Sequence, residues 1–228
     1  MFTKFIQLGI ISSLFIAHLN ATSVRPTTLV LDKRHKVTQV AINNTSNKDQ
    51  IFEVNVFKWT QNPDGTRNME KINDPLLIVT PRIVSIPSGQ QKKVRIAKFI
   101  TDSFPESYRV LISEIPDQTK QPVNKVRATV KTIRVFNLPM FVNQKQYHSV
   151  NRVSQNSDFI RLRNPNPGYV KIRGVTYTDE QGHQAYIKRL KYILSWSTSD
   201  FGLPKTFRAT RMRIEYGDNH IQTINLKH

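Results

Sequence analysis

The sequence predicts an all-β protein built from two immunoglobulin-like β-sandwich domains in tandem. Short runs rich in β-branched and aromatic residues follow one another along the chain, and Asn-, Pro- and Gly-rich turn signals separate them. No segment keeps a 3.6-residue apolar period long enough for a helix. A chain of 228 residues is also long enough for two hydrophobic cores, each in a domain of about 100 residues.

Seven predicted strands in the first half match the strand count of an immunoglobulin-like sandwich. They cover residues 28–31, 37–42, 51–59, 83–86, 93–96, 108–112 and 126–136. A second set covers residues 159–162, 169–177, 185–187, 192–194, 207–216 and 221–226. The break between the sets falls near Pro139 to Gln146, and we predict one domain over residues 22–139 and another over residues 140–228.

The first 21 residues have the pattern of a secretory signal peptide. Lys4 lies in a basic start, residues 5–17 are apolar, and Ala21 offers a cleavage site. The apolar run is shorter than the about 20 residues that a transmembrane helix needs, although an uncleaved anchor is the alternative. We expect an exported mature chain that begins at Thr22 and has no stable membrane insertion.

The composition is that of a basic globular protein without disulfides. The chain has 34 Lys and Arg against 16 Asp and Glu, a formal net charge of +18, and no cysteine. Such a charge favours acidic partners, but export argues against nucleic acid. An exported protein without cysteine fits the bacterial periplasm, and we expect that location.

Catalytic and metal-binding signatures are missing from the sequence. The six histidines are scattered singly, and there is no HExxH, GxSxG, Walker or GxGxxG motif. Paired carboxylates cannot be recognised from sequence alone, so a carbohydrate enzyme on a sandwich fold is a minor alternative. We expect no enzyme, no cofactor and no metal site.

Several segments resemble, in order and spacing, the periplasmic pilus chaperones of the PapD-like family. They are residues 80–96 (TPRIVSIPSGQQKKVRI), 113–116 (SEIP), 132–139 (TIRVFNLP), 160–170 (IRLRNPNPGYV) and 200–202 (DFG). The segment of about nine residues between Pro116 and Val126 resembles the short-loop class of this family. The resemblance covers nearly all of the mature chain.

The resemblance implies a chaperone that captures pilin subunits and delivers them to an outer-membrane usher. A pilin subunit lacks the last strand of its fold, and the chaperone lends its own strand to the open groove. Here that strand is expected over residues 126–136. By the alternation of side chains in a strand, Val126, Ala128 and Val130 share one face and are the expected donor residues.

The family also binds the C-terminal carboxylate of the subunit with a pair of basic residues. One member corresponds to Arg134, but Thr28 stands where the other is expected. Arg109 is the first candidate for the missing cation and Arg25 is the second. We expect Arg109 and Arg134 to reach the same cleft.

The family joins its two domains through an acid–arginine–acid bridge. Glu106 and Asp200 match the two acids, whereas Leu138 replaces the arginine.

A rival hypothesis is an exported basic β-sandwich protein that binds polyanions. It would need basic and aromatic residues gathered on one face. In the sequence the basic residues are spread out, and Lys92, Lys93, Arg211 and Arg213 have the pattern of solvated strand faces.

Overall fold

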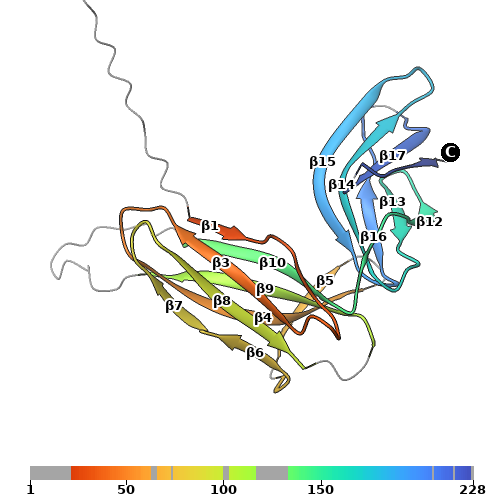
Figure 1. Ribbon diagram of the computed structural model, residues 1–228. Helices are drawn as coiled ribbons and strands as arrows, with labels where there is room; N and C mark the ends of the chain where they lie inside the picture. The colour runs from red at the N-terminus through yellow and green to blue at the C-terminus, as the bar shows by residue number, and fades with distance from the viewer. Residues whose placement is uncertain are drawn as a thin grey trace, which may run out of the picture.

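The computed structural model describes residues 22–62, 66–72, 74–99, 103–116, 133–206, 208–217 and 219–226, apart from the side chain of Arg189. All regular secondary structure in these residues is β (Figure 1), which confirms the all-β prediction. The strands fall into two groups of sheets that follow one another along the chain. The two groups meet at one end of each, and the molecule is bent at that junction.

The first group is a sandwich of two sheets. Its strands are β1 (Thr22–Arg25), β2 (Leu29–Leu31), β3 (Val37–Asn44), β4 (Gln50–Gln61), β5 (Arg67–Lys71), β6 (Leu77–Thr80), β7 (Ile83–Ile86), β8 (Gln91–Lys98), β9 (Glu106–Ile115) and β10 (Val135–Val142). One sheet has the order β1-β3-β8-β6, and the other β2-β10-β9-β4-β5 with β7 beside β4.

The second group forms the C-terminal sandwich. Its strands are β11 (Gln146–Tyr147), β12 (Asn151–Gln155), β13 (Phe159–Arg163), β14 (Tyr169–Thr178), β15 (Gln184–Ile193), β16 (Thr198–Gly202), β17 (Arg211–Tyr216) and β18 (Ile221–Asn225). One sheet has the order β11-β14-β17-β18 with β15 on the other side of β14, and the second sheet is β12-β13-β16.

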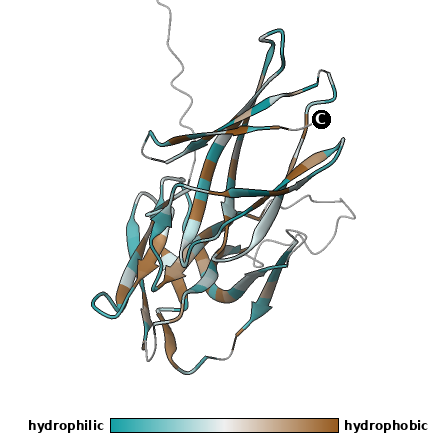
Figure 2. Cartoon of the chain, turned by 90° about the vertical axis from the view of Figure 1, so that its right-hand side faces the viewer, coloured by the Kyte–Doolittle hydropathy of each residue, from teal (hydrophilic) through white to brown (hydrophobic). Residues whose placement is uncertain are grey.

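Period-2 alternation places the core between the sheets. Val40 and Ile42 of β3 face Val110 and Ile112 of β9, and all four are fully buried. Figure 2 shows the same alternation of apolar and polar residues along strands of both domains. Burying one such side chain stabilises the fold by about 1.5–3 kcal/mol, so the paired apolar rows hold the sheets together.

Two buried asparagines close the turns that the sequence predicts. Asn44 donates from Nδ2 to the carbonyl oxygens of Lys48 and Ile86, and its Oδ1 accepts from the backbone N–H of Ser46. Asn164 makes the corresponding contacts in the second domain, donating to the carbonyl oxygen of Gly168. Such side chains replace backbone partners in a turn, which is why Asn can be buried there.

Six strands of the structure, β1, β5, β6, β11, β12 and β16, have no counterpart among the predicted ones. Two other differences concern strand boundaries. The predicted strands 185–187 and 192–194 are a single strand, β15, which passes through the basic stretch between them with an irregularity opposite Arg173. β10 continues to Val142, so the sheets change at residues 143–145, which lie within the predicted break and a few residues after the domain limit placed at Pro139. Of the predicted strand 126–136, only residues from 133 onward are described.

Candidate functional site

The first half of β10 has an open edge. β10 pairs with β9 along its whole length, but it pairs with β2 only from Met140 to Val142. Among the described residues, therefore, residues 135–139 have a partner on one side only. Ile133 and Val135 present apolar side chains here, 50% and 54% exposed. Unpaired backbone groups beside exposed apolar residues form a template for another strand.

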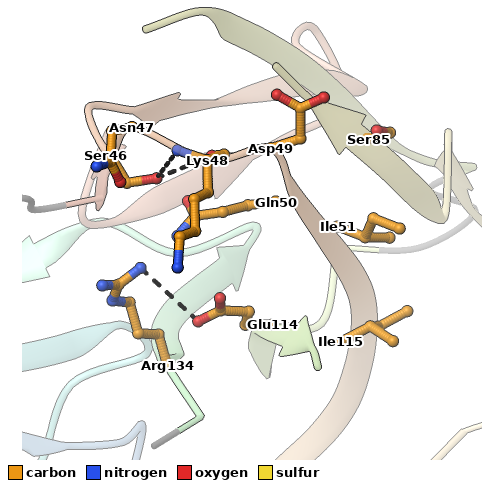
Figure 3. A pocket seen from close by; sticks show the side chains of 10 residues that line it. All are labelled: Ser46, Asn47, Lys48, Asp49, Gln50, Ile51, Ser85, Glu114, Ile115 and Arg134. Carbon is orange, nitrogen blue, oxygen red and sulfur yellow. Dashed lines mark hydrogen bonds and ion pairs between the residues drawn. The ribbon is translucent and has the colours of Figure 1, made fainter. Parts of the chain in front are cut away.

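Arg134 lies at the start of this edge and lines a hollow of about 850 Å³ (Figure 3). Its Nη1 lies 3.8 Å from Glu114 Oε2 and donates to Thr22 Oγ1 at 3.4 Å. Thr22 in turn donates to Gln50 Oε1 at 2.7 Å. Both contacts of Arg134 are long, and the side chain is more than one-third exposed, so the guanidinium can accept a further anionic partner.

Lys48 is a second cation of the same hollow, and the sequence analysis missed it. It lies on the β3–β4 turn that Asn44 fixes, and Figure 3 shows its ammonium directed toward Arg134. Its Nζ makes no hydrogen bond or ion pair with any described residue. Lysines are common in surface turns, so the sequence alone did not distinguish Lys48 from the others. Its position beside Arg134 depends on the register of the sheets.

Arg109 does not reach the hollow of Arg134, and the expectation that the two arginines share one cleft is not met. The backbone N–H of Glu114 donates to the carbonyl oxygen of Arg134, so Arg134 lies five positions beyond Arg109 along β9. At about 3.3 Å per residue the separation is roughly 17 Å. The side chain of Arg109 also points away from the core, opposite to Tyr108 and Val110, and toward the second domain.

Arg109 instead lies in the junction between the domains. Its guanidinium is 3.6 Å from the ring centroid of Trp59 and 5.8 Å from that of Tyr192, and the residue is 9% exposed. Its guanidinium makes no hydrogen bond or ion pair with a described residue. Burial, with a smaller contribution from Arg67, lowers the pKa of Arg109 to about 10. The aromatic faces therefore replace an acid as the partners of this cation.

Aromatic rings form the centre of the junction. Phe141 stacks on Tyr169 with 3.7 Å between centroids, and Trp59 meets Tyr192 edge-on at 6.0 Å. At the rim Gln61 Nε2 donates to the carbonyl oxygen of Tyr192, and Gln61 Oε1 accepts from the backbone N–H of Leu194 at 2.7 Å. This junction buries apolar surface and needs no charge pair across it.

Glu106 and Asp200 do not bridge the domains, because each is neutralised within its own. Glu106 Oε1 accepts from Lys58 at 2.6 Å and from Tyr108 at 2.8 Å, and its Oε2 lies 3.3 Å from Lys98. Asp200 makes a two-pronged pair with Arg161 at 2.7 and 2.8 Å. Basic residues of the same domain lie within ion-pair distance of each acid. Neither carboxylate is therefore available to a partner in the other domain.

Arg25 and Thr28 also lie away from the hollow. Arg25 is exposed on the outer face of the β1-β3-β8-β6 sheet, whereas Thr22 on the same strand is buried. Thr28 Oγ1 lies 3.4 Å from the hydroxyl of Tyr192 in the domain junction. The donor candidates Val126, Ala128 and Val130 lie outside the described residues.

Replacing Glu106 with Gln is expected to lower the free energy of unfolding by about 2 kcal/mol at pH 7, because charged hydrogen bonds are lost. Burial would raise the pKa of Glu106, but the Lys58 and Tyr108 hydrogen bonds lower it below its ordinary value of 4.5. A lowered pKa stabilises the fold above that value, and the contribution disappears as the pH falls through the folded-state pKa.

The difference between wild type and Glu106→Gln should therefore shrink between pH 7 and pH 3 in urea titrations. Glu70→Gln, an exposed acid on β5, is the control and should change little at either pH. An equal deficit of Glu106→Gln at both pH values would contradict the linkage.

No membrane-crossing helix of sufficient length and apolarity occurs among the residues that the structure describes. In the same residues no three His, Cys, Asp or Glu side chains gather as a possible metal site.

Residues 21–144 match the family model described as "Pili and flagellar-assembly chaperone, PapD N-terminal domain". This match covers more than half of the chain, and the protein belongs to this PapD-like family of pilus-assembly chaperones. The family is one of chaperones rather than a class of enzymes. No curated protein matches the chain.

Solved structures of pilus chaperones share the fold. A chain of the CsuC–CsuE chaperone–tip adhesion subunit pre-assembly complex from Acinetobacter baumannii is 19% identical, with a TM-score of 0.62 over 90% of this chain and 97% of that one. A chain of the Salmonella enterica SafA pilin–SafB chaperone complex is 15% identical, with a TM-score of 0.63 over 91% and 97%. The Escherichia coli chaperone DraB is 14% identical, with a TM-score of 0.61 over 91% and 98%.

Proposed function

We propose that this protein is a periplasmic chaperone that captures pilin subunits by donor-strand complementation and delivers them to an outer-membrane usher. The observation that carries the proposal is the open edge of β10 in a chain of the PapD-like family. A subunit that lacks a strand exposes an apolar groove and unpaired backbone groups. A lent strand satisfies both, because its backbone completes the sheet while alternate side chains fill the groove.

Two sets of side chains compete for the donor role. Val126, Ala128 and Val130 share one face by sequence alternation, and they are even-numbered. The exposed apolar residues of the described part, Ile133 and Val135, are odd-numbered. We propose the first set as the donor residues and treat Val135 as the test of the second.

We further propose that Arg134 anchors the C-terminal carboxylate of the subunit and that Lys48 supplies the second positive charge. Both line the hollow at the start of the open edge, so a carboxylate held there would set the register of the pairing strand. Arg109 and Arg25 point elsewhere, and we assign them no contact with this carboxylate.

The donor strand is tested by co-expression with the pilin-type subunit encoded beside this gene. Chaperone is purified from the periplasmic fraction, where its mass should correspond to a start at Thr22. An aspartate at position 130 would be buried without a partner in the groove, which costs several kcal/mol. Val130→Asp should therefore reduce the recovered subunit by about tenfold or more.

Val153→Asp is the matched control, because Val153 is an exposed valine of β12 in the other domain. It should recover as much subunit as the wild type. Loss with Val135→Asp but not with Val130→Asp would move the donor face to the odd-numbered residues. Full recovery with both variants would contradict strand donation by this segment.

A further inference from the structure

The outer face of the sheet formed by β15, β14 and β17 begins at the domain junction. Tyr192, near the end of β15, points out of the C-terminal core and packs on Trp59. By alternation along β15, Tyr186 and Lys188 lie on this same outer face, beyond the area that the first domain covers. The face is thus continuous with the junction but open to solvent.

Three cations of this face have no ion-pair or side-chain hydrogen-bond partner within the described chain. Lys188 of β15 lies opposite Gly174, and Arg211 and Arg213 of β17 lie opposite Thr178 and Thr176 of β14. All three cations are exposed and make no ion pair or side-chain hydrogen bond with a described residue. By contrast, Arg161 on the other sheet of this domain is held by Asp200.

A hollow of about 380 Å³ lies at one end of the face. Arg173 and Arg213 line it together with Glu215 and His220. Glu215 is the one acid that the described residues place on this face, and it accepts a hydrogen bond from the Tyr186 hydroxyl at 3.3 Å. The face is therefore strongly positive, with a concave place for an anionic side chain.

The margin of the face is an open strand with exposed apolar side chains. β15 spans ten residues and pairs only with β14 among the described strands. Tyr186 and Leu190 are 54% and 59% exposed. Tyr186 lies flat across Gly174, where an added Cβ would meet its hydroxyl at 2.6 Å, so the glycine lets the ring rest on the sheet.

We propose that this face, defined by Tyr186, Lys188, Leu190, Arg211 and Arg213, docks an extended acidic segment of a protein partner. The open edge of β15 offers backbone donors and acceptors that only a polypeptide can complete. Acidic side chains on the outer face of the added strand would meet Lys188 and lie beside Tyr186 and Leu190. Arg211 and Arg213 lie two strands further across the sheet and strengthen the positive field that attracts the segment. A second copy of β15 is a poor occupant, because it would bring Lys188 and its basic neighbours against the same charges.

The test uses the mature protein, ¹⁵N-labelled, titrated with the peptide acetyl-Glu-Val-Glu-Thr-Glu-Val-Glu-Thr-amide. Chemical-shift changes are expected to concentrate on β15, β14 and β17. The double variant Lys188→Glu with Arg213→Glu should weaken binding by about tenfold or more, since it replaces the cation in contact with the peptide and reverses a charge that contributes to the attractive field. The matched control, Lys93→Glu with Arg95→Glu on exposed positions of β8, should leave binding unchanged.

Three outcomes would overturn the proposal. Equal losses in the two double variants would show that the peptide responds only to net charge. Shifts spread over both domains would show the same. Binding of heparin or of phosphatidylglycerol vesicles that is tighter than the peptide's, and equally sensitive to Lys188→Glu with Arg213→Glu, would assign the face to a non-protein polyanion. This surface is independent of the β10 edge, so loss of subunit capture by Val130→Asp has no bearing on it.

Discussion

Replacing Trp59 with alanine is expected to lower the free energy of unfolding by about 3–5 kcal/mol and to loosen the domain junction. The indole is buried between Tyr192 and Phe141, with ring centroids about 6 Å away, and it carries the guanidinium of Arg109 on its face. Alanine leaves a cavity between the domains and removes the main partner of a buried cation. Both losses fall on the contacts that fix the angle between the sandwiches.

Urea unfolding and small-angle X-ray scattering of the mature protein measure the two effects. Trp196→Ala is the matched control, because it removes the chain's other tryptophan, which is exposed. The radius of gyration should change for Trp59→Ala and stay the same for Trp196→Ala. If the two variants lose equal stability, the aromatic junction does not hold the domains.

Replacing Arg134 with alanine is expected to weaken subunit capture by about 2–5 kcal/mol, which is roughly thirtyfold or more. The guanidinium is the central cation of the hollow at the open edge, and its partners Glu114 and Thr22 are distant enough to admit a carboxylate. Lys48→Ala should cost less, because its ammonium lies on an exposed turn. The two losses should not add, since both residues would hold one group.

Recovery of co-expressed subunit measures these effects, with Arg25→Ala as the control of equal charge. Arg109→Ala should combine additively with Arg134→Ala, because the two side chains are far apart and share no partner. A normal yield of complex from Arg134→Ala would show that this cation is structural.

Local patterns in the sequence were enough to predict the fold class. Alternating apolar residues and flanking turn residues predict strands such as β3 and β9. Asn44 and Asn164 are buried in turns that the neighbouring turn-forming residues predict. The predicted strands ended at Ile187 and began again at Tyr192, which left the stretch from Lys188 to Lys191 unassigned although β15 runs through it. The strand persists there because Lys188 faces solvent at an open edge, whereas Lys191 turns toward Phe201 of the other sheet and donates to the carbonyl oxygen of Asp200.

The site depended on information that local patterns do not contain. Arg134 was found through its motif, but whether Arg109 shares its cleft depends on strand register and on which face each side chain takes. The aromatic junction joins Trp59 to Tyr192, residues far apart in sequence and in different domains. A bridge between Glu106 and Asp200 was expected to join the domains, but each acid is paired with a cation of its own domain. The aromatic junction makes the contacts between the domains instead.

Site-specific photo-crosslinking tests most directly whether a subunit occupies the open edge of β10. A photoreactive phenylalanine analogue is placed at Ile133, at Val135 or, as control, at Val153, and the protein is irradiated with co-expressed subunit in the periplasm. Ile133 and Val135 flank the free edge, whereas Val153 lies on β12 of the other domain. A chaperone–subunit adduct is expected from positions 133 and 135, and none is expected from 153. Adducts from 153 alone, or equal adducts from all three positions, would contradict it.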